Sequence, residues 1–169
     1  MTSAEAKMLD FAPYLPAVLA PSSVRSREIY EQNQHRVYSL AFLMTDSELA
    51  AEELMSQAFC RAFRASAEPS VDGIDDALMT ELRTYFDIGS VTLNCAPCDR
   101  VLGVRRNTLR VELERAVVQL PDTEKLMFLL HDVEGYDHAR VARLLETTEE
   151  ESQRGVHQAR LRLRELLAS

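Results

Sequence analysis

Tryptophan is absent from the 169-residue sequence, and glycine and proline are scarce, with 5 and 6 residues. Loop-rich and many-stranded folds use more of both, so this scarcity disfavours them. The 3 cysteines are too few for a disulfide-stabilised scaffold. Hydrophobic residues make up 46% of the chain, which is enough for a packed core and excludes global disorder.

Signals for secretion or membrane insertion are also missing. No apolar run approaches the roughly 18 residues of a spanning helix. The N-terminus has an acid before its first base, and prolines interrupt the early apolar run. We therefore expect a soluble, cytoplasmic protein that does not contact a membrane. The formal net charge of −8 excludes nucleic-acid binding through bulk positive charge, but it still allows a local basic patch.

Catalytic signatures are not found either. The sequence has no glycine-rich phosphate loop and no H-E-x-x-H or G-x-S-x-G motif around its 4 histidines. Adjacent acids such as Glu52 and Glu53 point to different sides of a helix and cannot share a substrate. We expect no enzyme activity, no catalytic residue and no cofactor.

Apolar periodicity predicts a helical hairpin in the first half of the chain. No Gly or Pro occurs from residue 22 to 68, which leaves room for two long helices. The first has an apolar face at helical spacing, made of Val37, Leu40, Ala41 and Met44. The second has one made of Ala51, Leu54, Met55, Ala58 and Ala62. Thr45 and Glu48 have the spacing of a capping box, which predicts the start of the second helix.

The C-terminal third shows the same periodicity. One predicted apolar stripe contains Leu109, Leu113, Ala116 and Leu120, and a second contains Leu126, Leu129, Leu130 and Val133. A short helix over about 137–145 and a last helix from Thr148 follow. The sequence therefore predicts an all-α fold of two small helical domains joined by an irregular linker. We assign residues 1–24 to an N-terminal arm, 25–90 to the first domain, 91–106 to the linker and 107–169 to the second domain.

The end of the chain has the layout of a helix-turn-helix. A helix of about two turns, a polar turn and a longer helix deliver the second helix into the major groove of DNA. That second helix contains four arginines with no acid between the first and the last: Arg154, Arg160, Arg162 and Arg164. DNA contact and a solvated arginine-rich helix end both explain this pattern.

Two segments resemble the extracytoplasmic-function sigma factors of RNA polymerase. Residues 109–167 are similar to the promoter-reading fourth region, through Leu120-Pro121, Asp132-Val133-Glu134-Gly135-Tyr136 and His157-x-Ala159-Arg160. Residues 28–65 are similar to the second region, through Ala51-Glu52-Glu53-Leu54, Gln57 and Phe59. The resemblance implies a two-domain transcription initiation factor that binds core RNA polymerase and promoter DNA.

The resemblance also implies roles for individual residues. Glu53, Gln57 and Arg61 would bind the clamp of the polymerase β′ subunit, and the fourth region would touch the β flap and read the −35 element. The residues carried over to DNA binding are Gln153, Arg154, His157, Gln158 and Arg160. Arginine pairs with guanine, glutamine with adenine, and either can contact phosphates. Whether an anti-sigma factor binds the chain stays open.

Departures from the family leave a second function open. Glu149, Glu150 and Glu151 begin the last helix, where they would oppose phosphates, and Gly155 stands where the family commonly has arginine. The middle of the chain is acidic, and no residue could be assigned to the −10 element. A sigma-like interaction protein that binds a regulator or polymerase without reading DNA is therefore the alternative.

Two further features have alternative explanations. Cys95 and Cys98 are inert thiols, a redox pair or half of a zinc site, of which we expect inert thiols and no bound metal, because a closed zinc site needs four ligands. The apolar N-terminal arm either packs on the hairpin or covers the groove between the two domains and holds the factor inactive.

Overall fold

The computed structural model describes residues 24–97 and 109–168, and every regular element in these ranges is helical. The prediction of an all-α fold is confirmed. The first three helices are α1 (Val24–Thr45), α2 (Glu48–Ala65) and α3 (Val71–Tyr85). The later ones are α4 (Arg110–Val118), α5 (Asp122–Phe128), the π-helical turn η4 (Leu129–Val133), α6 (His138–Leu145) and α7 (Glu149–Ala168). Residues 1–23 of the N-terminal arm and Cys98 lie outside the described residues, while Val24, assigned to the arm, is the first residue of α1.

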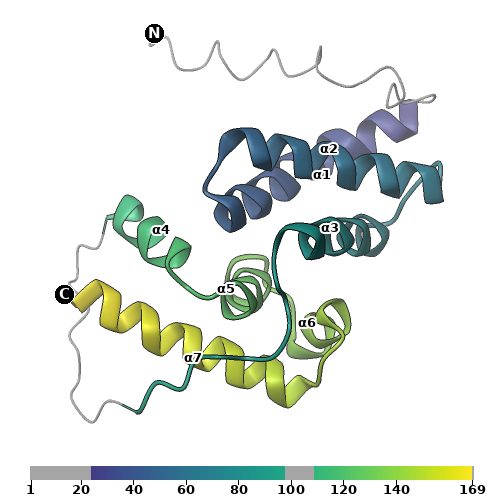
Figure 1. The fold of residues 1–169 in the computed structure, drawn as a ribbon. Helices are drawn as coiled ribbons and strands as arrows, with labels where there is room; N and C mark the ends of the chain where they lie inside the picture. The colour runs from purple at the N-terminus through teal and green to yellow at the C-terminus, as the bar shows by residue number, and fades with distance from the viewer. Residues whose placement is uncertain (1–23, 98–108, 169) are drawn as a thin grey trace, which may run out of the picture.

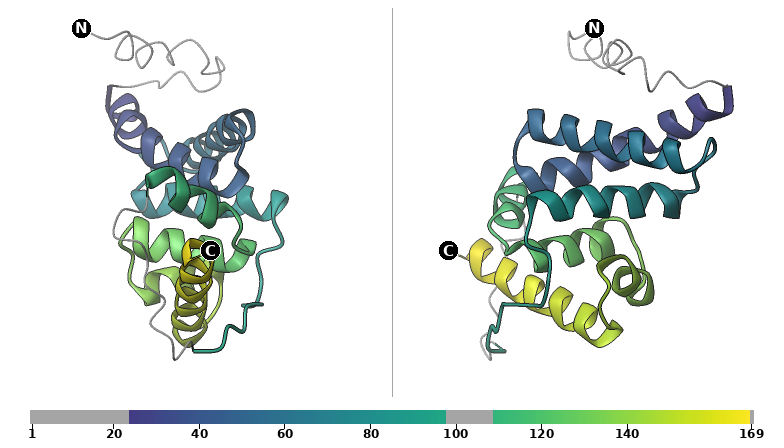
Figure 2. Two further views of the ribbon diagram at one scale, coloured as in Figure 1. Left: turned by 90° about the vertical axis from the view of Figure 1, so that its left-hand side faces the viewer. Right: turned by 45° about the vertical axis from the view of Figure 1, so that its right-hand side comes forward.

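The helices form two groups that lie against each other (Figures 1 and 2). In the first group α1 packs on α2, and α2 packs on α3. In the second group α5 and α6 pack on α7. The groups meet where α3 faces α6 and where α1 contacts α4 and α5. The two groups pack against each other, so their contacts do not separate two domains. The domain limits 25–90 and 107–169 stay a prediction.

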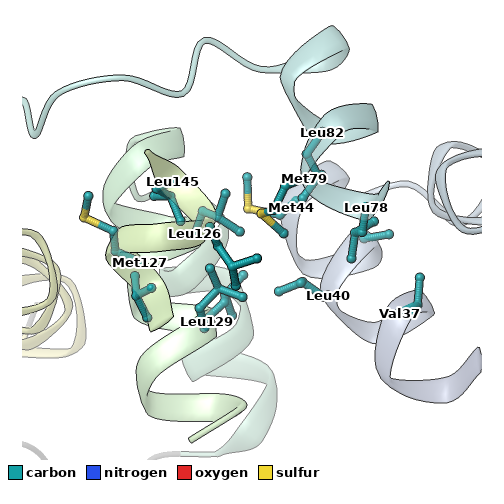
Figure 3. Packing of buried hydrophobic residues seen from close by; sticks show 14 of the residues in the cluster. Val37, Leu40, Met44, Leu78, Met79, Leu82, Leu126, Met127, Leu129 and Leu145 are labelled. Carbon is teal, nitrogen blue, oxygen red and sulfur yellow. The ribbon is translucent and has the colours of Figure 1, made fainter. Parts of the chain in front are cut away.

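One continuous apolar core runs through both groups. The α1 face expected to be apolar is buried, as are the inward faces of α3 and α5 (Figure 3). In Figure 3, Leu126 and Leu129 of the second group lie opposite Leu40 and Met44 of α1. Burial of this apolar surface, at about 25 cal/mol per Å², is the main force that holds the two groups together.

The start of α2 differs from the expected one. Thr45 is the last residue of α1, and its hydroxyl donates to the Ala41 carbonyl at 2.9 Å. Ser47 caps α2 instead, since its side chain accepts from the Ala50 amide. The predicted Thr45–Glu48 capping box is therefore wrong. Two residues of the connection, Asp46 and Ser47, suffice to turn the chain, because Asp46 takes a positive φ of 51°.

The acidic middle of the chain contains a regular helix, α3, that periodicity did not single out. Ser70 caps it by accepting from the Gly73 amide at 3.1 Å. Pro69 lies just before the helix and Gly73 lies in its first turn. Proline outside a helix and glycine in its first turn are both compatible with helix formation.

Three residues expected to be buried in the second group are exposed. Leu109 and Leu113 are 66% and 41% exposed, because α4 packs through Ala116 and Val117 near its end. Val133 is 58% exposed. The cause is η4, where the Glu134 amide bonds to the Leu129 carbonyl at 3.0 Å, five residues back. The wider turn rotates Val133 away from the core.

Candidate nucleic-acid interface

Helices α6 and α7 form the expected helix-turn-helix. Asp137 caps α6 by accepting from the Arg140 amide at 2.8 Å. The turn begins at Glu146, whose left-handed backbone (φ 57°, ψ 44°) ends α6. The Glu151 amide then donates to the Thr148 hydroxyl at 3.1 Å, so Thr148 caps the start of α7. The Glu151 carboxylate accepts from the Val91 amide, so Thr148 and Glu151 form only half of a capping box.

The outer face of α7 carries the residues predicted to contact DNA. Gln153, Arg154, His157 and Arg160 are exposed, and Gln158 is half-buried. The inner face of α7 is buried and consists of Ser152, Gly155, Val156, Ala159 and Leu163. The helix therefore presents all five predicted residues away from the core.

Part of that outer face is covered by the chain itself. Residues 89–97, which we call the linker segment, leave α3 and run along α7 (Figure 1). The Arg154 guanidinium donates to the Val91 carbonyl at 3.1 Å, and the Cys95 amide donates to Gln158 Oε1 at 2.5 Å. The Val91 amide donates to the Glu151 carboxylate at 2.9 Å. Two predicted DNA-contacting side chains are thus bonded to the linker segment.

A buried carboxylate anchors the linker segment. Glu124 of α5 is fully buried, and its Oε1 accepts from the Thr92 amide at 2.5 Å, the Leu93 amide at 2.6 Å and the Thr92 hydroxyl at 3.1 Å. Sequence reasoning did not single out Glu124. In the sequence Glu124 stands in the polar run Asp122-Thr123-Glu124-Lys125, so no local signal marks it as a buried carboxylate that requires partners.

The linker segment also explains Gly155. A Cβ on Gly155 would lie 2.2 Å from Met127 Sδ and 3.0 Å from Val91 Cγ2, so the position has no room for a side chain. Next to it, a cavity of about 290 Å³ between the linker segment and α7 includes Arg154 and Gln158 in its lining. Glycine at this position therefore lets the linker segment and α5 approach α7 closely.

Arg160 of α7 is paired with Asp132 of η4, within the second group of helices. Its guanidinium forms two hydrogen bonds with the Asp132 carboxylate, at 2.8 and 2.6 Å, and this pairing raises its pKa. The Arg160 side chain is still 49% exposed, so it keeps contact with solvent. Arginine holds this planar, two-bond geometry with phosphate as well as with carboxylate.

Two histidines stack beside Arg160. The rings of His131 and His138 are 4.1 Å apart and nearly parallel, and His138 Nδ1 lies 3.0 Å from the Ser152 hydroxyl. Burial, together with the charges of His131 and Arg160, lowers the pKa of His138. The neutral ring is therefore the form that this packing favours at neutral pH.

The predicted polymerase-binding residues lie on α2 and point outward. Glu53 and Arg61 are exposed, Gln57 is half-buried, and the Gln57 amide donates to Glu53 Oε1 at 3.1 Å. Arg61 donates to Glu81 of α3 at 2.6 Å. The structure brings Glu53 and Gln57 together, while Arg61 bridges α2 and α3.

The cysteine motif is only half within the described residues. Cys95 is a half-buried free thiol, and burial, followed by the charge of Glu165, raises its pKa. Within residues 24–97 and 109–168, no group of three or more His, Cys, Asp or Glu side chains is arranged to hold a metal ion. In the same ranges no helix has the length and apolarity needed to cross a bilayer.

Comparison with known proteins finds a similarity in the C-terminal region of the chain. No curated protein matches the chain. Residues 100–163, which include the helix-turn-helix, match the family described as Sigma-70, region 4. This similarity supports a role in transcription and DNA binding rather than an enzymatic one. It covers only the C-terminal part of the chain, and that part is similar to the fourth region of the sigma-70 family.

Proposed function

We propose that the protein is an extracytoplasmic-function sigma factor that directs RNA polymerase to promoters in the cytoplasm. The observation that carries this proposal is the α6–α7 helix-turn-helix within the segment that matches sigma-70 region 4. Helix α7 is the recognition helix, and its outer face reads the −35 element in the major groove. Among its predicted contact residues, exposed Gln153 and His157 are the best placed to reach base edges.

The polymerase is bound through two surfaces in this proposal. The outward face of α2, with Glu53, Gln57 and Arg61, binds the clamp of the β′ subunit. The C-terminal helices touch the flap of the β subunit. An anti-sigma factor is a further candidate partner, which the resemblance brings in as a regulator of such factors.

Run-off transcription with core RNA polymerase on pooled genomic templates tests the proposal. Wild-type protein should give promoter-dependent transcripts and co-purify with core polymerase. Glu53→Lys with Gln57→Ala should lose both, while Gln153→Ala with His157→Ala should lose the transcripts and keep the polymerase. Gln32→Ala, an exposed change on α1, is the matched control. The absence of any promoter-dependent transcript from wild-type protein would rule out the sigma-factor function.

A sigma-like interaction protein that does not read DNA is the second candidate. The observation that favours it is that Arg154, Gln158 and Arg160 are all bonded within the chain. A salt titration of duplex binding separates the two candidates, because a DNA reader loses affinity steeply as salt neutralises its phosphate contacts. The second candidate predicts no measurable duplex affinity but retained binding to a regulator or to polymerase.

A further inference from the structure

Three aspartates on α3 bond to the two outward arginines of α6. Arg140 lies 2.8 Å from Asp72 and 3.0 Å from Asp75, and Arg143 lies 2.9 Å from Asp76 and 3.5 Å from Asp72. These contacts join residues more than 60 positions apart in the sequence. The acidic middle of the chain, in which no residue could be assigned to the −10 element, therefore faces the first helix of the helix-turn-helix.

The position of Arg140 and Arg143 matters because of how this motif docks. In helix-turn-helix proteins the first helix crosses the DNA backbone while the second enters the groove. Cations on the first helix then contact phosphates, which position the protein without reading sequence. Arginine binds carboxylate and phosphate with the same planar geometry. A carboxylate bonded to such an arginine occupies the place of a phosphate.

We propose that Arg140 and Arg143 form a phosphate-binding site for duplex DNA, and that Asp72 and Asp76 of α3 fill it in the free protein. This inference rests on the proposed function, since it requires the helix-turn-helix to bind a duplex. Helix α3 acts as an internal substitute for the DNA backbone. Binding of the C-terminal helices to DNA then requires Asp72 and Asp76 to release the two arginines.

The exposure of the paired groups makes such an exchange feasible. The side chains of Asp72, Asp76 and Arg143 are 63%, 57% and 48% exposed. Ion pairs this open to solvent are weak and are screened by salt, so phosphates can displace the carboxylates. Asp75 differs, because it is buried and also accepts from Arg36 and Tyr136. Asp75 therefore holds the groups of helices together, while Asp72 and Asp76 compete with phosphate.

Duplex binding by the full chain tests the proposal. The probe is a fluorescein-labelled 30-bp duplex of random sequence, because phosphate contacts do not depend on sequence. Asp72→Asn with Asp76→Asn should bind the duplex roughly tenfold more tightly, the sum of a few exposed ion pairs. The slope of log affinity against log salt should steepen by about 0.9 for each phosphate newly contacted.

Matched variants separate this effect from a general change in charge. Glu31→Gln with Glu52→Gln removes the same charge from α1 and α2 and should give a much smaller gain. Adding Arg140→Gln and Arg143→Gln to the α3 variant should remove its gain and its steeper slope. Urea unfolding midpoints confirm that each variant is folded.

The possible failures are distinguishable. Equal affinities for the α3 variant and the Glu31/Glu52 variant would overturn the inference, and so would a gain that survives loss of both arginines. If wild-type protein still supports promoter-dependent transcription in that case, the proposed function stands alone. If no variant binds the duplex and wild-type protein gives no transcript, both the inference and the proposed function are wrong.

Discussion

Gly155 shows how one residue fixes the approach of three segments. It lies in the middle of α7, where glycine costs about 1 kcal/mol relative to alanine in helix propensity. Its neighbours Met127 and Val91 are both buried, so neither can move aside without disturbing the core. Packing therefore outweighs propensity at this position.

Replacement of Gly155 by alanine should destabilise the protein in spite of the better helix former. Overpacking a filled site costs about 1–3 kcal/mol, which exceeds the propensity gain. Urea unfolding measures the loss. Gly73→Ala is the matched control, since a Cβ there meets nothing closer than 3.5 Å, and it should stabilise the protein by up to about 1 kcal/mol. Equal stabilisation by both changes would contradict the packing argument.

His138 should make the folded protein sensitive to mild acid. Its pKa is lowered in the folded state, chiefly by burial, so protonation favours the unfolded state. The stabilising contribution is complete above the ordinary histidine pKa of about 6.5 and declines as the pH falls below it. The urea midpoint should therefore fall between pH 7 and pH 5.

His138→Asn should flatten that decline, because it removes the titrating ring and keeps a polar atom near Ser152. An identical pH profile for wild type and His138→Asn would show that His138 does not control the acid response.

At the scale of elements, the linker segment behaves as part of the C-terminal group although it has no regular structure. One oxygen of Glu124 accepts from the Thr92 and Leu93 amides in place of the backbone partners that a helix or strand would provide, and it also accepts from the Thr92 hydroxyl. Buried backbone amides need such partners, because leaving them unpaired is costly. Glu124 therefore fixes the path of the chain between the two groups of helices.

Glu124→Gln should loosen the linker segment. The bonds of Thr92 and Leu93 to a charged acceptor would become bonds to a neutral amide, and a charged acceptor contributes about 1.5–3 kcal/mol per bond against about 1 for a neutral one. We expect a loss of about 2 kcal/mol in urea unfolding. Amide hydrogen exchange at Thr92 and Leu93 should accelerate first.

A matched change separates this local effect from a loss of charge. Glu114→Gln removes an exposed carboxylate that pairs with Arg110 on α4 and should change stability by less than about 0.5 kcal/mol. Unchanged exchange at Thr92 and Leu93 in Glu124→Gln would show that another group anchors the linker segment.

The elements themselves were largely predictable from sequence, because their signals are local. The apolar face of α1 follows from helical spacing, and so does the helix-turn-helix layout of α6 and α7. The burial of residues that depend on distant contacts or on an unusual turn could not be predicted in this way. Val133 follows the helical pattern but leaves the core, because η4 widens the turn before it.

At the scale of the whole molecule, Asp75 joins the two groups of helices. It is 1% exposed and accepts from Arg36 at 2.6 Å, Tyr136 at 2.7 Å and Arg140 at 3.0 Å. Burial, followed by the hydrogen bond to Asp75, raises the pKa of Tyr136. Asp75 of α3 therefore bonds to α1 and to the second group at the same time.

Asp75→Asn should cost about 3 kcal/mol, the lower end of the loss when one partner of a buried ion pair is removed. The lower end applies because the Arg36 and Arg140 side chains remain 21% and 31% exposed. Urea unfolding measures the loss. Asp76→Asn, one residue along but 57% exposed, should change stability by less than about 0.5 kcal/mol. Similar losses for the two would contradict a special role for Asp75.

The sequence pointed to candidate DNA-contacting residues but not to their partners within the chain. The resemblance assigned Arg154 and Arg160 to DNA contact, which stays a prediction, and both lie on the outer face of α7. Their bonds to Val91 and Asp132 join positions 63 and 28 residues apart. Pairings of this kind arise from the packing of whole helices, and no local pattern in the sequence encodes them.

The shared core has a consequence for how the protein is made. Chains leave the ribosome with the N-terminus first, and domains generally fold in that order. Helices α1 to α3 are thus complete before α5, whose Leu126 faces Met44 and Leu40 in the finished molecule (Figure 3). During that interval the apolar face of α1 that later packs against α5 is exposed to solvent in the nascent chain. Its synthesis should therefore depend on chaperones, and a translational pause before residue 122 would increase aggregation.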